Sequence, residues 1–277
     1  MSSDLDMELG SVGNGFGFAE GPLWHPKGFL LFSDLIKNEI VKVENGKIET
    51  FLVSSGLNGP KSAYHHEQIG SNALAVDKNG DILLCQHGNH GIAKLLANGK
   101  LEIIVDSYNG RRLNSPNDMT LAPDGSILFT DPPYGLKGQR LLPHVAQPMA
   151  GVYKYLDGRL ELLTDDYQFP NGICFSPDYQ YVYIGSNHKN EYIKRYEYRS
   201  GKLYSGEVFV KENADGLKTD SEGNLYLATM KGIQLVSPTG EKIKLIRTPE
   251  MATNLCFQGN EMFITCPHEV YKTTLRR

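Results

Sequence analysis

A hairpin-like unit repeats six times along the chain, and this repeat limits the possible folds more than any other feature. Each unit consists of a polar residue, an apolar strand-like run, a turn and a second apolar run. The six units begin at Glu20, Asn72, Asn117, Asn171, Asp215 and Asn254. These starts lie 39 to 54 residues apart, a spacing that indicates a repeat fold in which each repeat is one small sheet.

Tight turns divide each unit into strands, because glycine supplies the positive φ that hairpin turns require. The first turn of four units is Lys27-Gly28, Asn79-Gly80, Asp124-Gly125 or Glu222-Gly223. A second turn follows in the first five units, at Asn45-Gly46, Asn98-Gly99, Asp157-Gly158, Ser200-Gly201 and Thr239-Gly240. Two hairpins give four strands per unit, which is the content of a β-propeller blade. We therefore expect an all-β protein with one six-bladed β-propeller domain over residues 1–277.

The sixth unit is too short to hold a fourth strand, since the chain stops at "EVYKTTLRR". The segment "DLDMELGSV" near the N-terminus, residues 4–12, is expected to supply that outer strand and close the ring. Long amphipathic helical patterns are absent from the sequence, which disfavours an α/β fold.

The charge distribution excludes several classes of partner. The net charge is −4 and no block of basic residues occurs, whereas nucleic-acid and polybasic membrane surfaces need clustered Lys and Arg. The N-terminal segment "MSSDLDMELGSVGNG" shows neither the positive start nor the apolar core typical of a secretory signal, and the sequence has no apolar run of about 20 residues. We expect a cytoplasmic protein, monomeric or weakly homo-oligomeric, that binds a small molecule and neither nucleic acid nor membrane.

The four cysteines are predicted to be buried free thiols. They are far apart, form no C-x-x-C pair and lie in apolar strand-like runs: Cys85, Cys174, Cys256 and Cys266.

The first residue of every unit is a carboxylate or a carboxamide, and this pattern predicts a ligand site. The first strand of each propeller blade lines the central channel, so the six positions converge on one axis. A hydrogen-bonding role at strand starts would explain one such residue, but six of six indicate a ring of oxygen donors. Two carboxylates with neutral amides suit a divalent cation, and the channel width favours Ca²⁺, with Mg²⁺, Mn²⁺ and Zn²⁺ as alternatives.

We expect four of the ring residues to bind the metal: Glu20, Asn117, Asn171 and Asp215. For Asn72 and Asn254 three roles stay open, namely metal binding, substrate contact and packing.

Four stretches of the chain resemble one known family. "FAEGPLW", "LNSPNDMTLAPDGSILFTDPPYG", "FPNGICFSPD" and "ADGLKTDSEGNLYLAT" are similar to motifs of the gluconolactonase or senescence-marker-protein (regucalcin) family of calcium-dependent lactonases. The resemblance implies a six-bladed propeller with metal ligands at Glu20, Asn171 and Asp215. It places Asn117 at a position that binds metal or substrate in different members. The regucalcin branch has Arg two residues before this Asn, where this chain has Ser115, as in the bacterial gluconolactonase-like branch.

Two long connections, residues 56–71 and 132–150, are predicted to be binding loops or lids. Polar side chains also end the second strands of several units: His87, Asp131, His188 and His268. We expect His87 and His268 to be the best secondary candidates for proton transfer. Asp131, together with Asn72 and Asn117, is expected to contact substrate.

These observations predict a hydrolase that opens the ring ester of a small lactone, such as a sugar-acid lactone. Ca²⁺ would polarise the carbonyl, and Asp215 would act as general base or as nucleophile. Two alternatives stay open. One is the same metal site acting on a phosphotriester or another ester, and the other is a non-catalytic propeller whose loops bind a protein partner.

Overall fold

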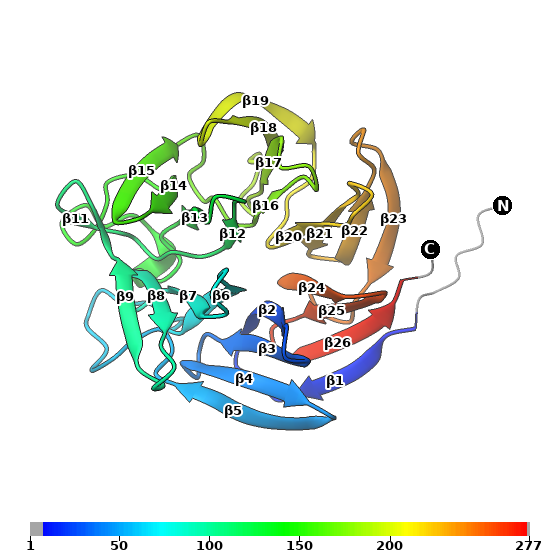
Figure 1. Cartoon of the computed structure of the whole chain (residues 1–277), viewed down its shortest axis with the longest axis horizontal. Coiled ribbons are helices and arrows are strands. Elements are labelled where there is room, and N and C mark those ends of the chain that lie inside the picture. Colours follow the sequence, from blue (N-terminus) through cyan, green and yellow to red (C-terminus); the bar gives the residue numbers. More distant parts are fainter. Residues whose placement is uncertain (1–7, 276–277) are drawn as a thin grey trace.

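The computed structural model describes residues 8–275, and these form six four-stranded antiparallel sheets around a central axis (Figure 1). The first three blades, from the inner strand outward, are β2 (Ala19–His25), β3 (Phe29–Asp34), β4 (Glu39–Glu44) and β5 (Lys47–Val53); β6 (Ser71–Val76), β7 (Ile82–Gln86), β8 (Gly91–Leu95) and β9 (Leu101–Val105); and β12 (Met119–Leu121), β13 (Ile127–Asp131), β14 (Gly151–Leu156) and β15 (Arg159–Thr164).

The other three blades are β16 (Ile173–Phe175), β17 (Tyr181–Ile184), β18 (Ile193–Arg199) and β19 (Lys202–Val210); β20 (Leu217–Thr219), β21 (Leu225–Thr229), β22 (Gly232–Val236) and β23 (Lys242–Arg247); and β24 (Asn254–Gln258), β25 (Glu261–Thr265), β26 (Glu269–Thr274) and β1 (Gly10–Asn14). A short hairpin, β10 (Ser107–Tyr108) with β11 (Arg111–Arg112), lies outside the blades. The predicted six-bladed propeller is therefore confirmed.

The ring is closed between the two ends of the described chain. β1 pairs antiparallel with β26, with Gly10 opposite Lys272 and Asn14 opposite Glu269, and Figure 1 shows it along the outer edge of that blade. The predicted closing strand is thus found at Gly10–Asn14, slightly later than expected, and residues 4–7 of the predicted segment lie outside the described residues.

The turn glycines have the backbone conformation that the sequence predicts. All nine have positive φ. Gly125, at φ +87°, completes the turn between β12 and β13, where the Asp124 carboxylate accepts the Ser126 N–H at 2.9 Å.

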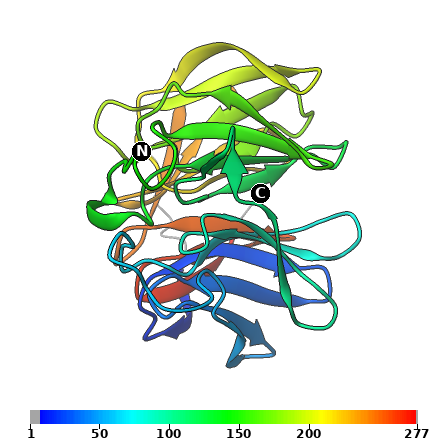
Figure 2. The same cartoon turned by 90° about the vertical axis from the view of Figure 1, so that its left-hand side faces the viewer.

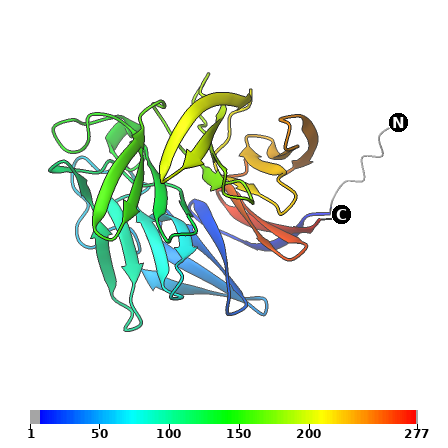
Figure 3. The ribbon, with the colours of Figure 1, turned by 45° about the horizontal axis from the view of Figure 1, so that its top comes forward.

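Apolar packing between neighbouring blades forms the core. Six buried clusters occur, one at each of the six blade interfaces, and each combines side chains from both adjoining sheets. The four cysteines are free and buried, as predicted. A side view and an oblique view show the blades as separate sheets (Figure 2, Figure 3). Because every blade is packed on both faces, the six inner strands are held at fixed positions around the channel.

Helical structure is minimal in residues 8–275. The one helical turn there is the 3-10 turn Lys137–Gln139, and no helix of this part of the chain is long and apolar enough to cross a membrane.

Candidate functional site

The inner strands bring the six predicted polar residues together at one end of the channel. Glu20 and Asn254 lie at or near the starts of β2 and β24, Asn72 lies in β6, and the other three stand two residues before their inner strands. All six are buried, with exposures from 1% to 8%. Five of them line a pocket of about 460 Å³: Glu20, Asn72, Asn117, Asn171 and Asp215.

Glycine follows three of the ring residues because neighbouring inner strands come very close there. A Cβ at Gly21 would overlap the backbone of Asn72, and a Cβ at Gly216 would overlap the Asn254 side chain. Gly172 is similarly close to the backbone of Asp215. The "EG", "NG" and "DG" pairs of the sequence therefore have a packing cause: only glycine lets the ring residues approach one another this closely.

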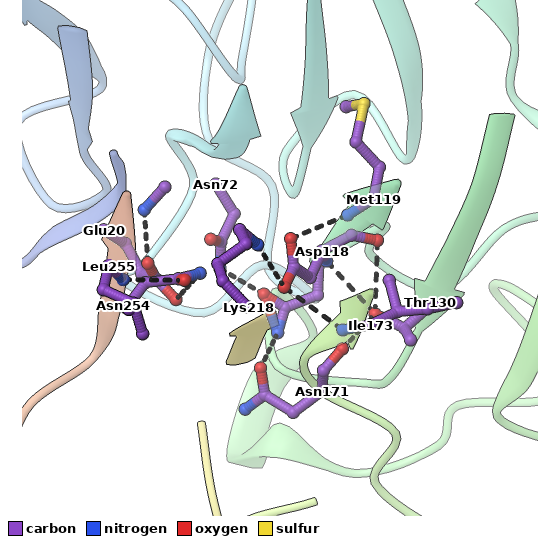
Figure 4. A network of polar contacts seen from close by, with 12 residues as sticks. Glu20, Asn72, Asp118, Met119, Thr130, Asn171, Ile173, Lys218, Asn254 and Leu255 are labelled. Carbon is purple, nitrogen blue, oxygen red and sulfur yellow. Dashed lines mark hydrogen bonds and ion pairs between the residues drawn. The ribbon is translucent and has the colours of Figure 1, made fainter. Parts of the chain in front are cut away.

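Amide groups link half of the ring into a chain of hydrogen bonds. Asn72 donates through Nδ2 to Asn117 Oδ1, and Asn117 Nδ2 donates to Asn171 Oδ1 at 3.0 Å. Asn171 in turn lies with its Nδ2 3.5 Å from the Tyr134 hydroxyl. Asn254 is turned toward Glu20, with its Nδ2 3.4 Å from Glu20 Oε1, and it does not line the pocket (Figure 4). Of its three open roles, packing against Glu20 is the one that the geometry supports.

The two ring carboxyls are both hard to ionise in the metal-free chain. Burial, and after it the charges of Asp215 and Asp118, raise the pKa of Glu20 well above its usual value. Burial raises the pKa of Asp215 to about 7, against a hydrogen bond from Asn171 that lowers it. A nearby cation would favour the charged form of both groups.

The donor set fits a hard divalent cation. No three His, Cys, Asp or Glu side chains in residues 8–275 gather into a metal cluster, so a cation in this pocket would need amide oxygens as well as carboxylates. Asn72 Oδ1 is a buried acceptor without a hydrogen-bond partner in the described chain. An orphaned oxygen in the same pocket as two buried carboxyls suits oxygen-binding cations such as Ca²⁺.

His87 lies beside the ring and presents an unprotonated nitrogen to the pocket. Its Nδ1 lies 3.1 Å from the carbonyl oxygen of Gln68, and because a carbonyl only accepts, Nδ1 carries the proton. Nε2 is therefore free to accept, 3.5 Å from Asn72 Nδ2. Burial lowers the pKa of His87 to about 4, so its imidazole is neutral at physiological pH.

Two of the residues expected at the site do not line the pocket. Asp131 is fully buried, and its carboxylate accepts the N–H groups of Asn114 and Ser115, each at 2.8 Å. Asp131 thereby fixes the turn that leads to Asn117. His268 is solvent-exposed and pairs through Nδ1 with Glu250 at 2.9 Å. Neither side chain is among those that face the pocket.

His188 lines the pocket instead, with Phe169 and Tyr134. The two long loops contribute as predicted: Gln68 comes from residues 56–71, and Tyr134, Gly138 and Gln139 come from residues 132–150. The loops also pair with each other, since Lys137 N donates to Tyr64 O at 2.7 Å and His66 N donates to Gly135 O at 2.8 Å.

Asp118 and Lys218 are polar residues of the channel that sequence reasoning missed. Asp118 accepts the Met119 N–H at 2.8 Å, and its other oxygen lies 3.6 Å from Lys218 Nζ (Figure 4). Burial lowers the pKa of Lys218, but the charges of Asp118, Cys174 and Glu20 and the hydrogen bond with Asp118 together outweigh this effect and keep the pKa above its usual value. A charge at this place could have been noticed, because Lys218 is the one charged residue among the six that stand three positions after a ring residue.

The fold and the ring define a class: a six-bladed propeller with a buried site of two acids and several amides at one end of its channel. Residues 18–268 match the family model described as "SMP-30/Gluconolactonase/LRE-like region", and the chain belongs to this family.

Individual relatives agree with this assignment. A gluconolactonase from Zymomonas mobilis is 30% identical over 97% of this chain and 82% of its own length. The structure of a gluconolactonase from Xanthomonas campestris superposes with a TM-score of 0.87 at 29% identity, covering 98% of this chain and 91% of that one. A regucalcin from Xenopus laevis is 26% identical over 92% of this chain and 84% of its own length. The predicted family is confirmed, and so is the expectation of a hydrolase of the lactonase type.

Proposed function

We propose that this protein is a divalent-cation-dependent hydrolase that opens the ring ester of a small lactone. The ring of oxygen donors at the base of the pocket supports the proposal most directly, since it joins two carboxyls and three amides in a space of small-molecule size. Relatives named gluconolactonase support a sugar-acid lactone as the substrate. The same relatives favour a lactone over a phosphotriester.

Glu20, Asn117, Asn171 and Asp215 are the proposed ligands of the cation, and Ca²⁺ is the proposed ion. The donors are all oxygens, which favours Ca²⁺ over Zn²⁺. An Agrobacterium tumefaciens structure of the same fold is described as a calcium-binding protein, which agrees with this choice. When bound, the cation supplies Lewis-acid polarisation of the ester carbonyl.

Asp215 has the proposed catalytic role. As a carboxylate it accepts the proton of the attacking water, or it attacks the carbonyl carbon itself. In the first route the new C–O bond forms from water, the ring C–O bond breaks, and the leaving alkoxide takes the proton back from Asp215. Asn72 and Asn117 orient the substrate through their amides. His87 can accept a hydrogen bond at Nε2, where Asn72 Nδ2 is the nearby donor, because its own proton is held on Nδ1 by the carbonyl of Gln68.

Hydrolysis of δ-gluconolactone with and without chelator tests this proposal. We expect activity to disappear in excess chelator and to return on addition of Ca²⁺. The melting temperature should fall on chelation as well, because a cation that binds only the folded ring stabilises it. Full lactonase activity of metal-free protein would contradict the metal role, and lack of hydrolysis by calcium-loaded protein would favour the non-catalytic alternative.

A further inference from the structure

Three aromatic rings from separate segments form one wall of the pocket. Tyr134 belongs to the loop after β13, Phe169 to the segment before β16, and His188 to the segment after β17. The ring centroids of Tyr134 and Phe169 are 5.9 Å apart at 29°, and those of Phe169 and His188 are 4.7 Å apart at 22°. All three side chains face the pocket. The result is a continuous stacked surface, which meets the ring of oxygen donors where the Tyr134 hydroxyl lies 3.5 Å from Asn171 Nδ2.

Hydrogen bonds fix the two segments that carry Phe169 and His188 in this aromatic wall. The Glu191 carboxylate accepts the N–H groups of Gln168 at 2.6 Å and Phe169 at 3.1 Å, and the Ser186 hydroxyl at 2.8 Å. Asn213 Nδ2 donates to the carbonyl oxygen of His188 at 2.6 Å.

The third ring of the wall, Tyr134, is also held by a hydrogen bond, which its hydroxyl donates to Asn187 Oδ1 at 2.7 Å. Residues 187–190 are exposed, so these hydrogen bonds, rather than burial, restrict the conformation of this segment. Preorganised rings lose little entropy when a ligand binds.

The rest of the pocket lining carries no cation. Among the described lining residues the charged side chains are Glu20 and Asp215, at the base, and no Lys or Arg is present. The other contributors above the base are neutral: Phe18, Leu35, Gln68, Gln139, Asn187 and Met251. A phosphate or carboxylate carried by the substrate above the base would therefore find no Lys or Arg side chain to pair with, which is unfavourable.

We propose that Phe169, flanked by Tyr134 and His188, determines specificity by stacking against the C–H face of an uncharged lactone ring, and that Glu191 is a positioning residue for this wall. The inference rests on the proposed function, since it names the wall that holds the lactone above the oxygen ring. Flat apolar faces stack well on aromatic rings, and the amides opposite the wall leave hydrogen-bonding capacity for ring substituents.

Steady-state kinetics of the calcium-loaded full chain test the wall. With δ-gluconolactone and with δ-valerolactone, F169A should raise KM roughly tenfold and leave kcat within about twofold, because stacking is lost while the oxygen ring is intact. F169Y, which keeps an aromatic ring at this position, should have a KM close to that of the wild type. E191Q should raise KM in the same direction as F169A. F51A removes an exposed phenylalanine of β5, outside the pocket, and should leave KM and kcat unchanged.

The charge discrimination is tested with 6-phosphogluconolactone. We expect its kcat/KM to be at least about tenfold lower than that of δ-gluconolactone. Equal kcat/KM values for the two substrates, or an unchanged KM in F169A, would overturn the proposal.

Binding of δ-valerolactam, measured by saturation-transfer NMR, separates this inference from the reaction. If no lactone is hydrolysed, the proposed function fails, and the wall is then judged by this uncharged cyclic amide alone. Binding that is lost in F169A and kept in F51A supports the wall. Equal binding by both variants overturns it.

Discussion

Replacing Asp215 by Asn should make the metal-free protein more stable than the wild type and the calcium-loaded protein less stable than the wild type. The carboxyl of Asp215 is buried at the base of the pocket, and burial together with the charge of Asp118 raises its pKa to about 7 in the metal-free chain. Asn has the same shape without the charge. The variant therefore removes an electrostatic penalty and a metal ligand at the same time.

The size of the penalty follows from the pKa values. The usual value for Asp is 3.8 and the value in the fold is about 7; at about 1.4 kcal/mol per tenfold change, the difference corresponds to about 4 kcal/mol. A carboxyl whose pKa is raised on folding destabilises the fold as pH rises from the unfolded value to the folded one. The penalty is therefore fully present above about pH 7 and absent below about pH 4.

Urea unfolding followed by circular dichroism measures the effect. In chelator at pH 8, D215N should be more stable than the wild type by up to about 4 kcal/mol, and the gap should shrink as the pH is lowered toward 4. In excess Ca²⁺ the order should reverse, because only the wild type keeps both carboxylates.

D165N is the matched control, since Asp165 is exposed and outside the pocket. It should differ from the wild type by less than about 0.5 kcal/mol in all conditions. A metal-free D215N that is less stable than the wild type at pH 8, or a gap that does not change with pH, would refute the reasoning.

Three further predictions concern the same channel. D215N should lose about 10²- to 10⁴-fold in kcat for lactone hydrolysis even at saturating Ca²⁺; near-wild-type turnover at high Ca²⁺ would leave Asp215 as a ligand only. Calcium affinity, measured by isothermal titration calorimetry, should fall at least about tenfold for each pH unit below about 7, because protons on Asp215 and Glu20 compete with the cation; a flat profile from pH 5 to 8 would contradict this. K218M should destabilise the metal-free protein by about 3–5 kcal/mol in urea unfolding, because Asp118 loses its partner, and D118N/K218M should recover much of the loss; equal stability of the single and double variants would disprove the pairing.

The propeller could be predicted because its determinants are local and repeated. Glycine turns such as Asp124-Gly125 set each hairpin, and the spacing of the six polar starts sets the number of blades. The convergence of Glu20, Asn117 and Asp215 followed from the fold symmetry, since equivalent positions of inner strands must meet at the axis.

Side chains outside the repeat could not be placed in this way. Asp131 and His87 both end second strands, yet Asp131 bonds to the backbone of Asn114 and Ser115 while His87 faces the pocket. His188 lines the pocket and His268 pairs with Glu250 at the surface. The direction in which each of these side chains points depends on the backbone of its loop, and the loops do not repeat from blade to blade.

The sequence by itself determined the all-β blades, the closing strand at the N-terminal side and the identity of the oxygen ring, because these depend on turn chemistry and on a period that repeats along the chain. Only the tertiary structure decided the pairing of Asp118 with Lys218 and the assembly of Tyr134, Phe169 and His188 into one wall. The Asp118–Lys218 and Tyr134–Phe169 contacts join different blades, while Phe169 and His188 flank the first two strands of one blade. The paired residues lie from 19 to 100 residues apart without a regular spacing, so tertiary packing, rather than any local pattern, brings them together.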